Sequence, residues 1–433
     1  MLEAVRGQLA AWHAAGVRAV RADLLLPQCS ELRADRWVFV RGGREIDLPL
    51  PDRAAGGRLR VIALGKAARS MAEGFFASVR RVASLPGAAA RVDAGLVITH
   101  EITPAAITAE AITPAAITPE AITPAARPGA PPWREIFGDH PYPGARSEQA
   151  ARELLDFIGR PLAADRFLVL LSGGASALCA LPVAGITLEA KRAATRELML
   201  AGAPIDELNR LRTRLSAIKG GKLARRMAPA RLITLAVSDV AGDDPAVIGS
   251  GPTFDPPAAP CLVIAKLDDA LQAIAAAAVD HAEVCMLGRT LYGTLVDEAQ
   301  RIAQTLRAAP PPSRPRLWIA GGEPRVTVHG GGRGGRAQEL ALRLAAAVAR
   351  EIPTRRVAGL VAGTDGADGP THAAGAFFDG DSIARIAAAD IDLEAALAAS
   401  DSHAVLDAVG DLFVTGPTGT NVADLLLVLE SPR

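Results

Sequence analysis

The chain has 433 residues, enough for two or three domains of ordinary size. Half of the residues are hydrophobic and 22% are charged, a balance that excludes global disorder and allows a sizeable core. Lysine plus arginine and aspartate plus glutamate number 47 each, so the net charge gives no argument for a nucleic-acid partner or an anionic membrane.

The first 26 residues predict a helix that packs on one face. Leu2, Val5, Leu9 and Trp12 recur at helical spacing, and arginines interrupt every apolar stretch, unlike in a secretory signal. No apolar run in the chain approaches ~18 residues, so we expect no membrane span. The cysteines are far apart and form no CxxC pair, which predicts reduced thiols in a cytoplasmic protein rather than disulfides or a zinc site.

Continuous apolar runs alternate with helical patterns along the chain. Such runs are typical of strands that are covered on both faces, so we expect parallel α/β sheets with helical crossovers. The clearest helices are predicted over 67–79 and over 336–352, where apolar residues recur on one face. The predicted strands lie within 60–66, 94–100, 166–174, 231–240, 316–323, 357–366, 410–416 and 424–430.

Two segments differ in composition from their surroundings. The proline-rich segment 310–316 reads as an interdomain linker between a larger domain, 1–309, and a smaller one, 317–433. A five-residue unit repeats within an insertion at 102–132. Its prolines favour an extended, flexible surface segment over a short-repeat solenoid, because so small a unit buries almost nothing.

The first candidate site is a small-residue loop after the apolar run 166–171. Its glycines would let backbone N–H groups approach an anion, and its serines would add hydroxyl donors. The loop matches no Walker A or GxGxxG pattern, so phosphate binding and a plain tight turn remain open. Lys66, which follows another strand, could reach the same phosphoryl group as a point charge. The loop residues are Ser172, Gly173, Gly174 and Ser176.

The basic segment 209–226 is a second candidate. Most of its charges fit a solvated helix face, but Asn209 and Arg212 are spaced to point in one direction. An arginine there suits a carboxylate or a phosphate.

Aspartates follow two of the predicted strands. Asp239 directly follows a strand, where a carboxylate can hold magnesium or accept a hydroxyl proton; Asp243 and Asp244 follow, and turn capping explains one or two of the three. Asp365 and Asp368 follow a later strand in the same way.

A glycine-rich loop with Gly334, Gly335 and Arg336 enters the predicted helix 336–352 at its positive end, where a phosphate could bind. The alternative for this loop and for the Asp365 loop is a pair of turn-rich connections. His140 is interpreted as structural, and no Ser-His-Asp arrangement is recognisable.

Together, and in this order, these stretches resemble the glycerate 2-kinase family of the MOFRL type, whose members are often labelled hydroxypyruvate reductase. The resemblance runs from Val61 to Leu429. The motifs that carry it are LSGGASAL, LNRLRTRLSAIKGGKLA, SDVAGDDPAVIGSGPT, GGRGGRAQELAL, GTDGADGPTHAAGA and VTGPTGTNVADL. The chain departs from the family pattern at Ala175, Arg214, Ala337 and His372.

The resemblance implies ATP- and magnesium-dependent phosphorylation of D-glycerate at its 2-hydroxyl. It also implies a Rossmann-like N-terminal domain and a smaller C-terminal α/β domain, with the active site in the cleft between them. Lys66 and Arg336 are the active-site residues that it implies. On this basis we expect Lys66 and Arg336 to neutralise the transferring group and the 172–176 loop, with Gly334 and Gly335, to bind phosphates.

The remaining expected roles follow from the same mechanism. Asp239 is expected to hold magnesium or act as the base, Asp365 to hold magnesium, and Asn209 with Arg212 to orient the substrate carboxylate. The alternatives are an NAD(P)H-dependent hydroxypyruvate reductase, which lacks a GxGxxG signal here, and a non-catalytic sugar-acid-binding module. The expected partners are D-glycerate and ATP, and the sequence is compatible with a homodimer.

Overall fold

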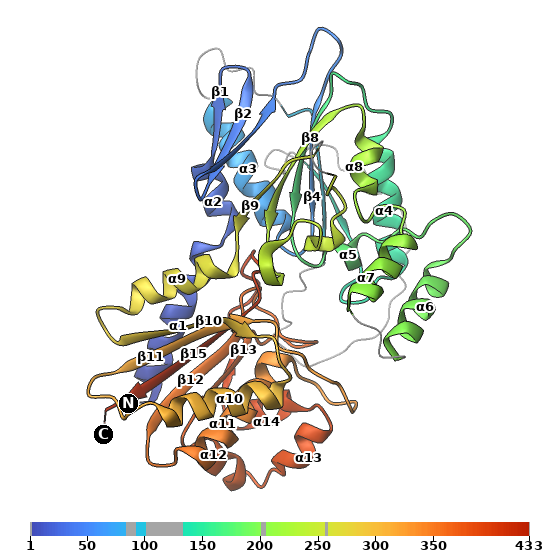
Figure 1. Cartoon of the computed structure of the whole chain (residues 1–433). Helices are drawn as coiled ribbons and strands as arrows, with labels where there is room; N and C mark the ends of the chain where they lie inside the picture. Colours follow the sequence, from blue (N-terminus) through green and yellow to red (C-terminus); the bar gives the residue numbers. More distant parts are fainter. Residues whose placement is uncertain (1, 84–91, 101–132, 201–204, 256–258, 433) are drawn as a thin grey trace, which may run out of the picture.

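The computed structural model describes residues 2–83, 92–100, 133–200, 205–255 and 259–432. The repeat and the whole insertion at 102–132 lie outside the described residues. Two six-stranded sheets with helices on both faces form two units, one above the other in Figure 1. Within the described ranges, no helix is both long and apolar enough to cross a membrane.

The first unit is built on a parallel sheet, as the continuous apolar runs predict. Its strand order is β6-β5-β4-β7-β8-β9, and all neighbours are parallel. Alternate residues face opposite cores: Val61 packs with the α2 and α3 side, and Ile62 packs with the α4 and α8 side. The strands are β4 (Leu59–Leu64), β5 (Ala94–Thr99), β6 (Arg134–Phe137), β7 (Arg166–Leu171), β8 (Arg231–Val237) and β9 (Cys261–Ala265).

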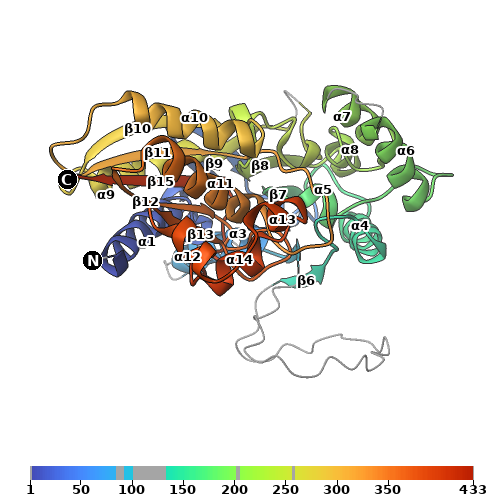
Figure 2. The same cartoon turned by 90° about the horizontal axis from the view of Figure 1, so that it is seen from below.

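The helices of this unit are α2 (Ala22–Cys29), α3 (Ala68–Ala83), α4 (Ala145–Ile158), α5 (Ala175–Leu178), α6 (Leu188–Leu200), α7 (Ile205–Arg214) and α8 (Lys222–Met227). Two short 3-10 turns, Ala241–Asp243 and Ile248–Ser250, follow β8. Figure 2 shows α6 and α7 at the end of the molecule that lies farthest from the chain termini. An antiparallel three-stranded sheet, which we did not predict, precedes β4: β1 (Ser30–Arg33), β2 (Arg36–Arg41) and β3 (Arg44–Pro49).

The order of strands in the first sheet reverses between β4 and β7. From β4 the chain adds β5 and β6 on one side, and β7, β8 and β9 follow on the other. Loops at such a reversal diverge from the carboxyl edge of the sheet and leave room for a ligand. Lys66 follows β4 and Gly173 follows β7, so both lie at this point.

The second unit has a mixed sheet, which corrects the expectation of parallel strands there. Its order is β10-β11-β15-β12-β13-β14, and only β10 and β11 are parallel neighbours. Its central strands still read as continuous apolar runs because helices cover both faces. The strands are β10 (Glu283–Leu291), β11 (Arg316–Gly322), β12 (Arg356–Gly363), β13 (Gly375–Asp379), β14 (Leu412–Phe413) and β15 (Asp424–Ser431).

The helices α1 (Leu2–Ala19) and α9 (Leu267–Ala278) pack together against one face of this second sheet. On the other face lie α10 (Leu295–Ala308), α11 (Arg336–Glu351), α12 (Ser382–Ala388), α13 (Leu393–Ala398) and α14 (Ser402–Ala408). The predicted helix 336–352 therefore matches α11 within one residue. The predicted opening helix is α1, although it serves the second unit rather than the first.

The segment 310–316 connects α10 to β11, two elements of the same unit. The second sheet already begins with β10 at Glu283, so the structural division differs from the boundary expected after residue 309. The reason is that β10 pairs with β11 through the α10 crossover, a contact that local composition does not reveal. One continuous apolar core, from Leu9 through Leu168 to Leu427, joins the two units.

Candidate active site

Lys66 is held at the carboxyl end of β4 by close contact between two loops. The Lys66 amide donates to the carbonyl of Gly173 at 2.9 Å. The preceding Gly65 has φ +121°, and a Cβ there would lie 2.3 Å from the Ser172 hydroxyl, so glycine is required. The β4 and β7 loops therefore pack directly on each other and fix the backbone of Lys66.

Lys66 forms an ion pair with Asp365 of the second unit, with 2.7 Å between Nζ and Oδ2. Burial disfavours the charge on Lys66, but the Asp365 carboxylate outweighs it and raises the pKa of Lys66. Burial would likewise raise the pKa of Asp365, yet Lys66 lowers it. Both groups are therefore charged at neutral pH, and the pair joins the units across 299 positions of sequence.

Asp239 packs against the glycine loop at Gly173. One of its carboxylate oxygens would be 1.6 Å from a Cβ at Gly173, so only glycine allows this approach. The Asn421 amide of the second unit donates to Asp239 at 3.0 Å. Burial, and then the nearby charge of Glu323, raise the pKa of Asp239 to about 7, against the opposing effect of Lys66. A cation near Asp239 and Glu323 would relieve this repulsion.

Arg336, the first residue of α11, is fixed by two carboxylates. Its guanidinium donates to both oxygens of Asp424, at 2.6 and 3.1 Å, and to Glu323 at 2.9 Å. Burial opposes its charge, but Asp424 and Glu323 raise the pKa of Arg336 well above its ordinary value. The positive charge of Arg336 opposes that of Lys66 and acts to lower the pKa of Lys66, so the two groups lie in one site built from both units.

Glu323, Asn421 and Asp424 belong to this cluster and were not predicted. Glu323 follows β11 and Asp365 lies just beyond β12, both at carboxyl ends. Asp424 instead begins β15, which runs antiparallel to both strands and so starts at the edge where they end. In a fully parallel sheet only the carboxyl ends of strands lie at the site, so the expected parallel arrangement did not predict a site residue at the start of a strand. The sequence feature that could have indicated Asp424 is its position directly before an apolar run.

The structure corrects the role of Ser172. Its side chain is fully buried, and its hydroxyl accepts a hydrogen bond from the Ala67 amide at 3.0 Å. It therefore caps the start of α3 rather than offering a donor to a ligand. Ser176 is placed differently from Ser172. Its hydroxyl forms hydrogen bonds with the Lys219 ammonium and with the Ser250 hydroxyl, the latter at 3.2 Å.

Gly334 and Gly335 also differ from the prediction, because protein groups already fill the space beside them. A Cβ at Gly335 would lie 2.2 Å from the Asp368 carboxylate, and one at Gly334 would lie 2.1 Å from the Ser402 hydroxyl. Asp368 accepts from the Ala337 and Gln338 amides at 3.1 and 2.8 Å. An internal carboxylate, not a phosphate, therefore caps α11.

Asp243 and Asp244 have structural partners, and His140 lies beside the glycine loop. Asp243 pairs with Arg289 at 2.7 Å, and Asp244 accepts from the Ala246 amide in a turn. Burial, and then the charge of Lys66, lower the pKa of His140 to about 4, so the imidazole is neutral at pH 7. Its ring lies near Gly174, 3.5 Å from a Cβ built there.

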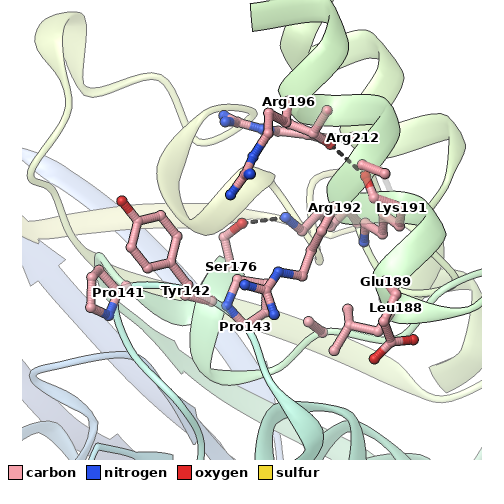
Figure 3. Close-up of a pocket in the computed structure, with 16 residues that line it drawn as sticks. Pro141, Tyr142, Pro143, Ser176, Leu188, Glu189, Lys191, Arg192, Arg196 and Arg212 are labelled. Carbon is pink, nitrogen blue, oxygen red and sulfur yellow. Dashed lines mark hydrogen bonds between the residues drawn. The ribbon is translucent and has the colours of Figure 1, made fainter.

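A cavity of about 760 Å³ opens beside the glycine loop (Figure 3). Gly174 and Ser176 line it, together with Arg212 from α7 and Lys219 from the segment after it. Asn209, which we expected to act with Arg212, is not among its lining residues.

Carboxylates are the metal ligands expected first in this cluster. Across the described parts of the chain, no three His, Cys, Asp or Glu side chains are grouped to hold a metal ion by themselves. Magnesium commonly takes one or two carboxylates and completes its octahedron with water and phosphate oxygens. Asp239 and Glu323 fit this requirement as a pair, because their charges repel each other and Lys66 and Arg336 only partly offset the rise in the pKa of Asp239. Asp365 fits it less well, because Lys66 and the Ala367 amide occupy its oxygens.

Comparison with known proteins gives matches along most of the chain. Residues 8–282 match the domain of unknown function DUF4147, and residues 316–424 match the MOFRL family. The D-glycerate 2-kinase of Thermotoga maritima is 34% identical over 67% of this chain and 78% of its own length. The glycerate 2-kinase of Pyrococcus horikoshii is 33% identical over 69% of this chain and 78% of its length.

Two further matches complete the comparison. A protein of Agrobacterium vitis, provisionally named hydroxypyruvate reductase, is 37% identical over 67% of this chain and 76% of its own length. The crystal structure of the Thermotoga maritima glycerate kinase superposes with a TM-score of 0.73 at 26% identity, covering 99% of this chain and 100% of that one. With both family regions matched in order on a shared two-unit fold, the chain belongs to the glycerate 2-kinase family of the MOFRL type.

Proposed function

We propose that the protein is an ATP- and magnesium-dependent kinase that phosphorylates D-glycerate at its 2-hydroxyl and releases 2-phosphoglycerate. The observation that carries the proposal is the Lys66–Asp365 ion pair, formed between the two units next to Arg336 and Asp239. Phosphoryl transfer depends on positioning and on neutralising charge over the transferring group. A cluster of fixed cations and carboxylates contributed by both units suits that requirement.

In this mechanism Lys66 and Arg336 face the transferring phosphoryl group. Both are held before substrate arrives, Lys66 by its backbone bond to Gly173 and Arg336 by Asp424 and Glu323. Preorganised charges of this kind need no rearrangement as the transition state forms, which lowers its free energy by several kcal/mol, as a rough scale.

Asp239 and Glu323 are the residues that would hold magnesium. We favour this role for Asp239 over that of a base, because a cation relieves its repulsion with Glu323. Magnesium supplies charge neutralisation on the phosphate oxygens. Asn421, which belongs to the second unit, fixes the Asp239 carboxylate. Metal binding therefore depends on the contact between the two units.

The test is a coupled ADP-release assay with D-glycerate, ATP and magnesium, with the product's position read by phosphorus NMR. We expect 2-phosphoglycerate. 3-Phosphoglycerate would contradict the proposed regiochemistry, and no ADP release would contradict the kinase activity. A parallel assay of NADH oxidation with hydroxypyruvate tests the reductase alternative, for which we expect no turnover.

A further inference from the structure

The cavity beside the glycine loop carries an unusual excess of positive charge. Among the described residues that line it, five are cationic and one, Glu189, is acidic. Figure 3 shows the side chains of Arg192, Arg196 and Arg212 gathered around the same space. The cationic residues are Lys191, Arg192, Arg196, Arg212 and Lys219.

Two of these cations are buried. The Lys191 and Lys219 side chains are 6% and 5% exposed. Lys219 bonds to the Ser176 hydroxyl, whereas the Lys191 ammonium has no hydrogen-bond partner among the described residues. Burial and neighbouring positive charges lower the pKa of Lys191 to about 8 and of Lys219 to about 7. A buried, unpaired ammonium destabilises the empty site, and a bound anion removes that penalty.

The cavity borders the loop that contacts Lys66. Gly174 lines it with φ +81°, and a Cβ at Gly174 would lie 2.9 Å from the Cγ of Lys66. Because Gly174 has no side chain, a ligand at this end of the cavity would lie next to the Lys66 side chain.

We propose that this cavity binds the polyphosphate chain of the nucleotide, with its terminal phosphate at the Gly174 end. This inference rests on the proposed kinase function. Five cations and about 760 Å³ exceed what the single carboxylate of a three-carbon acid requires, but they match a polyanion. Arg212 then belongs to the nucleotide rather than to the substrate carboxylate.

The direct test measures the binding of inorganic tripolyphosphate by calorimetry, without turnover. We expect the wild-type protein to bind it, Lys191→Met to weaken binding by about tenfold or more, and Arg196→Gln to weaken it by less. Lys191→Met keeps the volume and removes a buried charge, so it should fold at least as stably. Arg196 is exposed, so its variant guards against a folding defect.

Arg210→Gln is the matched control, since it removes the same charge from α7 at an exposed position that does not line the cavity. It should change binding by less than about twofold. Equal binding by wild type, Lys191→Met and Arg196→Gln, or no binding by the wild type, overturns the inference.

Steady-state kinetics separates this inference from the proposed function. If both hold, Lys191→Met raises KM for ATP with little change in KM for D-glycerate. A rise in KM for D-glycerate alone makes the cavity a carboxylate site and overturns the inference, while the kinase function stands. Tripolyphosphate binding that ATP displaces, in a wild type that does not phosphorylate D-glycerate, supports the cavity assignment and contradicts the proposed substrate.

Discussion

Lys66 and Asp365 are each other's main charge partners, so their contributions to stability and to activity can be separated. Lys66→Met should lower turnover by at least about 100-fold, because a preorganised cation is lost from the transferring group. It should also lower the free energy of unfolding by about 1–2 kcal/mol, since the mostly buried Asp365 loses its partner. Steady-state assays and urea denaturation measure the two effects.

Lys66→Met/Asp365→Asn is the matched double variant. It should recover most of the lost stability, because no unpaired charge remains, but none of the activity. A double variant as unstable as the single one would show that the ion pair is not the cause.

Asp239 shows the opposite relation between stability and function. Asp239→Asn should lower turnover by at least about 100-fold and raise the melting temperature, because it removes a desolvated carboxylate that Glu323 repels. The Asn421 amide can still donate to the new side-chain oxygen. Asp244→Asn in the same loop is the control, since the exposed turn tolerates the amide, and it should alter neither property.

At the scale of elements, Asp368 couples the cap of α11 to the position of Arg336. Asp368→Ala leaves the Ala337 and Gln338 amides without their acceptor and should lower the free energy of unfolding by about 2–3 kcal/mol. Because Arg336 begins that helix, activity should fall as well. Urea denaturation and the kinase assay measure both.

Asp392→Ala is the matched control for a cap far from the site. Asp392 is exposed and accepts from the Ala395 amide at the start of α13. Its loss should destabilise the protein by about 1 kcal/mol without changing activity. If Asp368→Ala retains full turnover, α11 does not depend on this cap to position Arg336.

At the scale of the whole molecule, α1 begins the chain but completes the core of the second unit, and His13 lies in that contact. His13 is buried against Phe413, with 5.2 Å between ring centroids, and desolvation lowers its pKa to about 4. In the unfolded chain its pKa is near 6.5. His13 therefore contributes stability that is fully present above pH 6.5 and is lost as pH falls toward 4.

This predicts an acid-labile contact between α1 and the second unit. Between pH 7 and pH 4.5, urea denaturation should show a smaller loss of stability in His13→Leu than in wild type, by about 2–3 kcal/mol at most. His281→Gln, at an exposed histidine, should follow the wild-type curve. Parallel curves for wild type and His13→Leu would exclude His13 as the source of acid lability.

Much of the fold followed from local patterns. The runs that became β4, β7 and β8 were recognisable because apolar residues on both faces of a strand leave no polar alternation. Lys66 and Asp239 stood out because each directly follows such a run. The direction of β15 did not follow, since an antiparallel strand covered on both faces has the same apolar pattern as a parallel one.

The sequence by itself indicated the strands β4, β5, β7, β8, β11, β12 and β15, the helices α1, α3 and α11, the family of the chain, and the residue types at strand ends, because hydrophobic periodicity and glycine act over a few neighbours. Only the tertiary structure decided that Lys66 meets Asp365, that Asp424 holds Arg336, and that the cations of α6 and α7 surround one cavity. Those contacts depend on strand direction and on packing between distant segments. The spacing of nearby residues determines neither strand direction nor packing between distant segments.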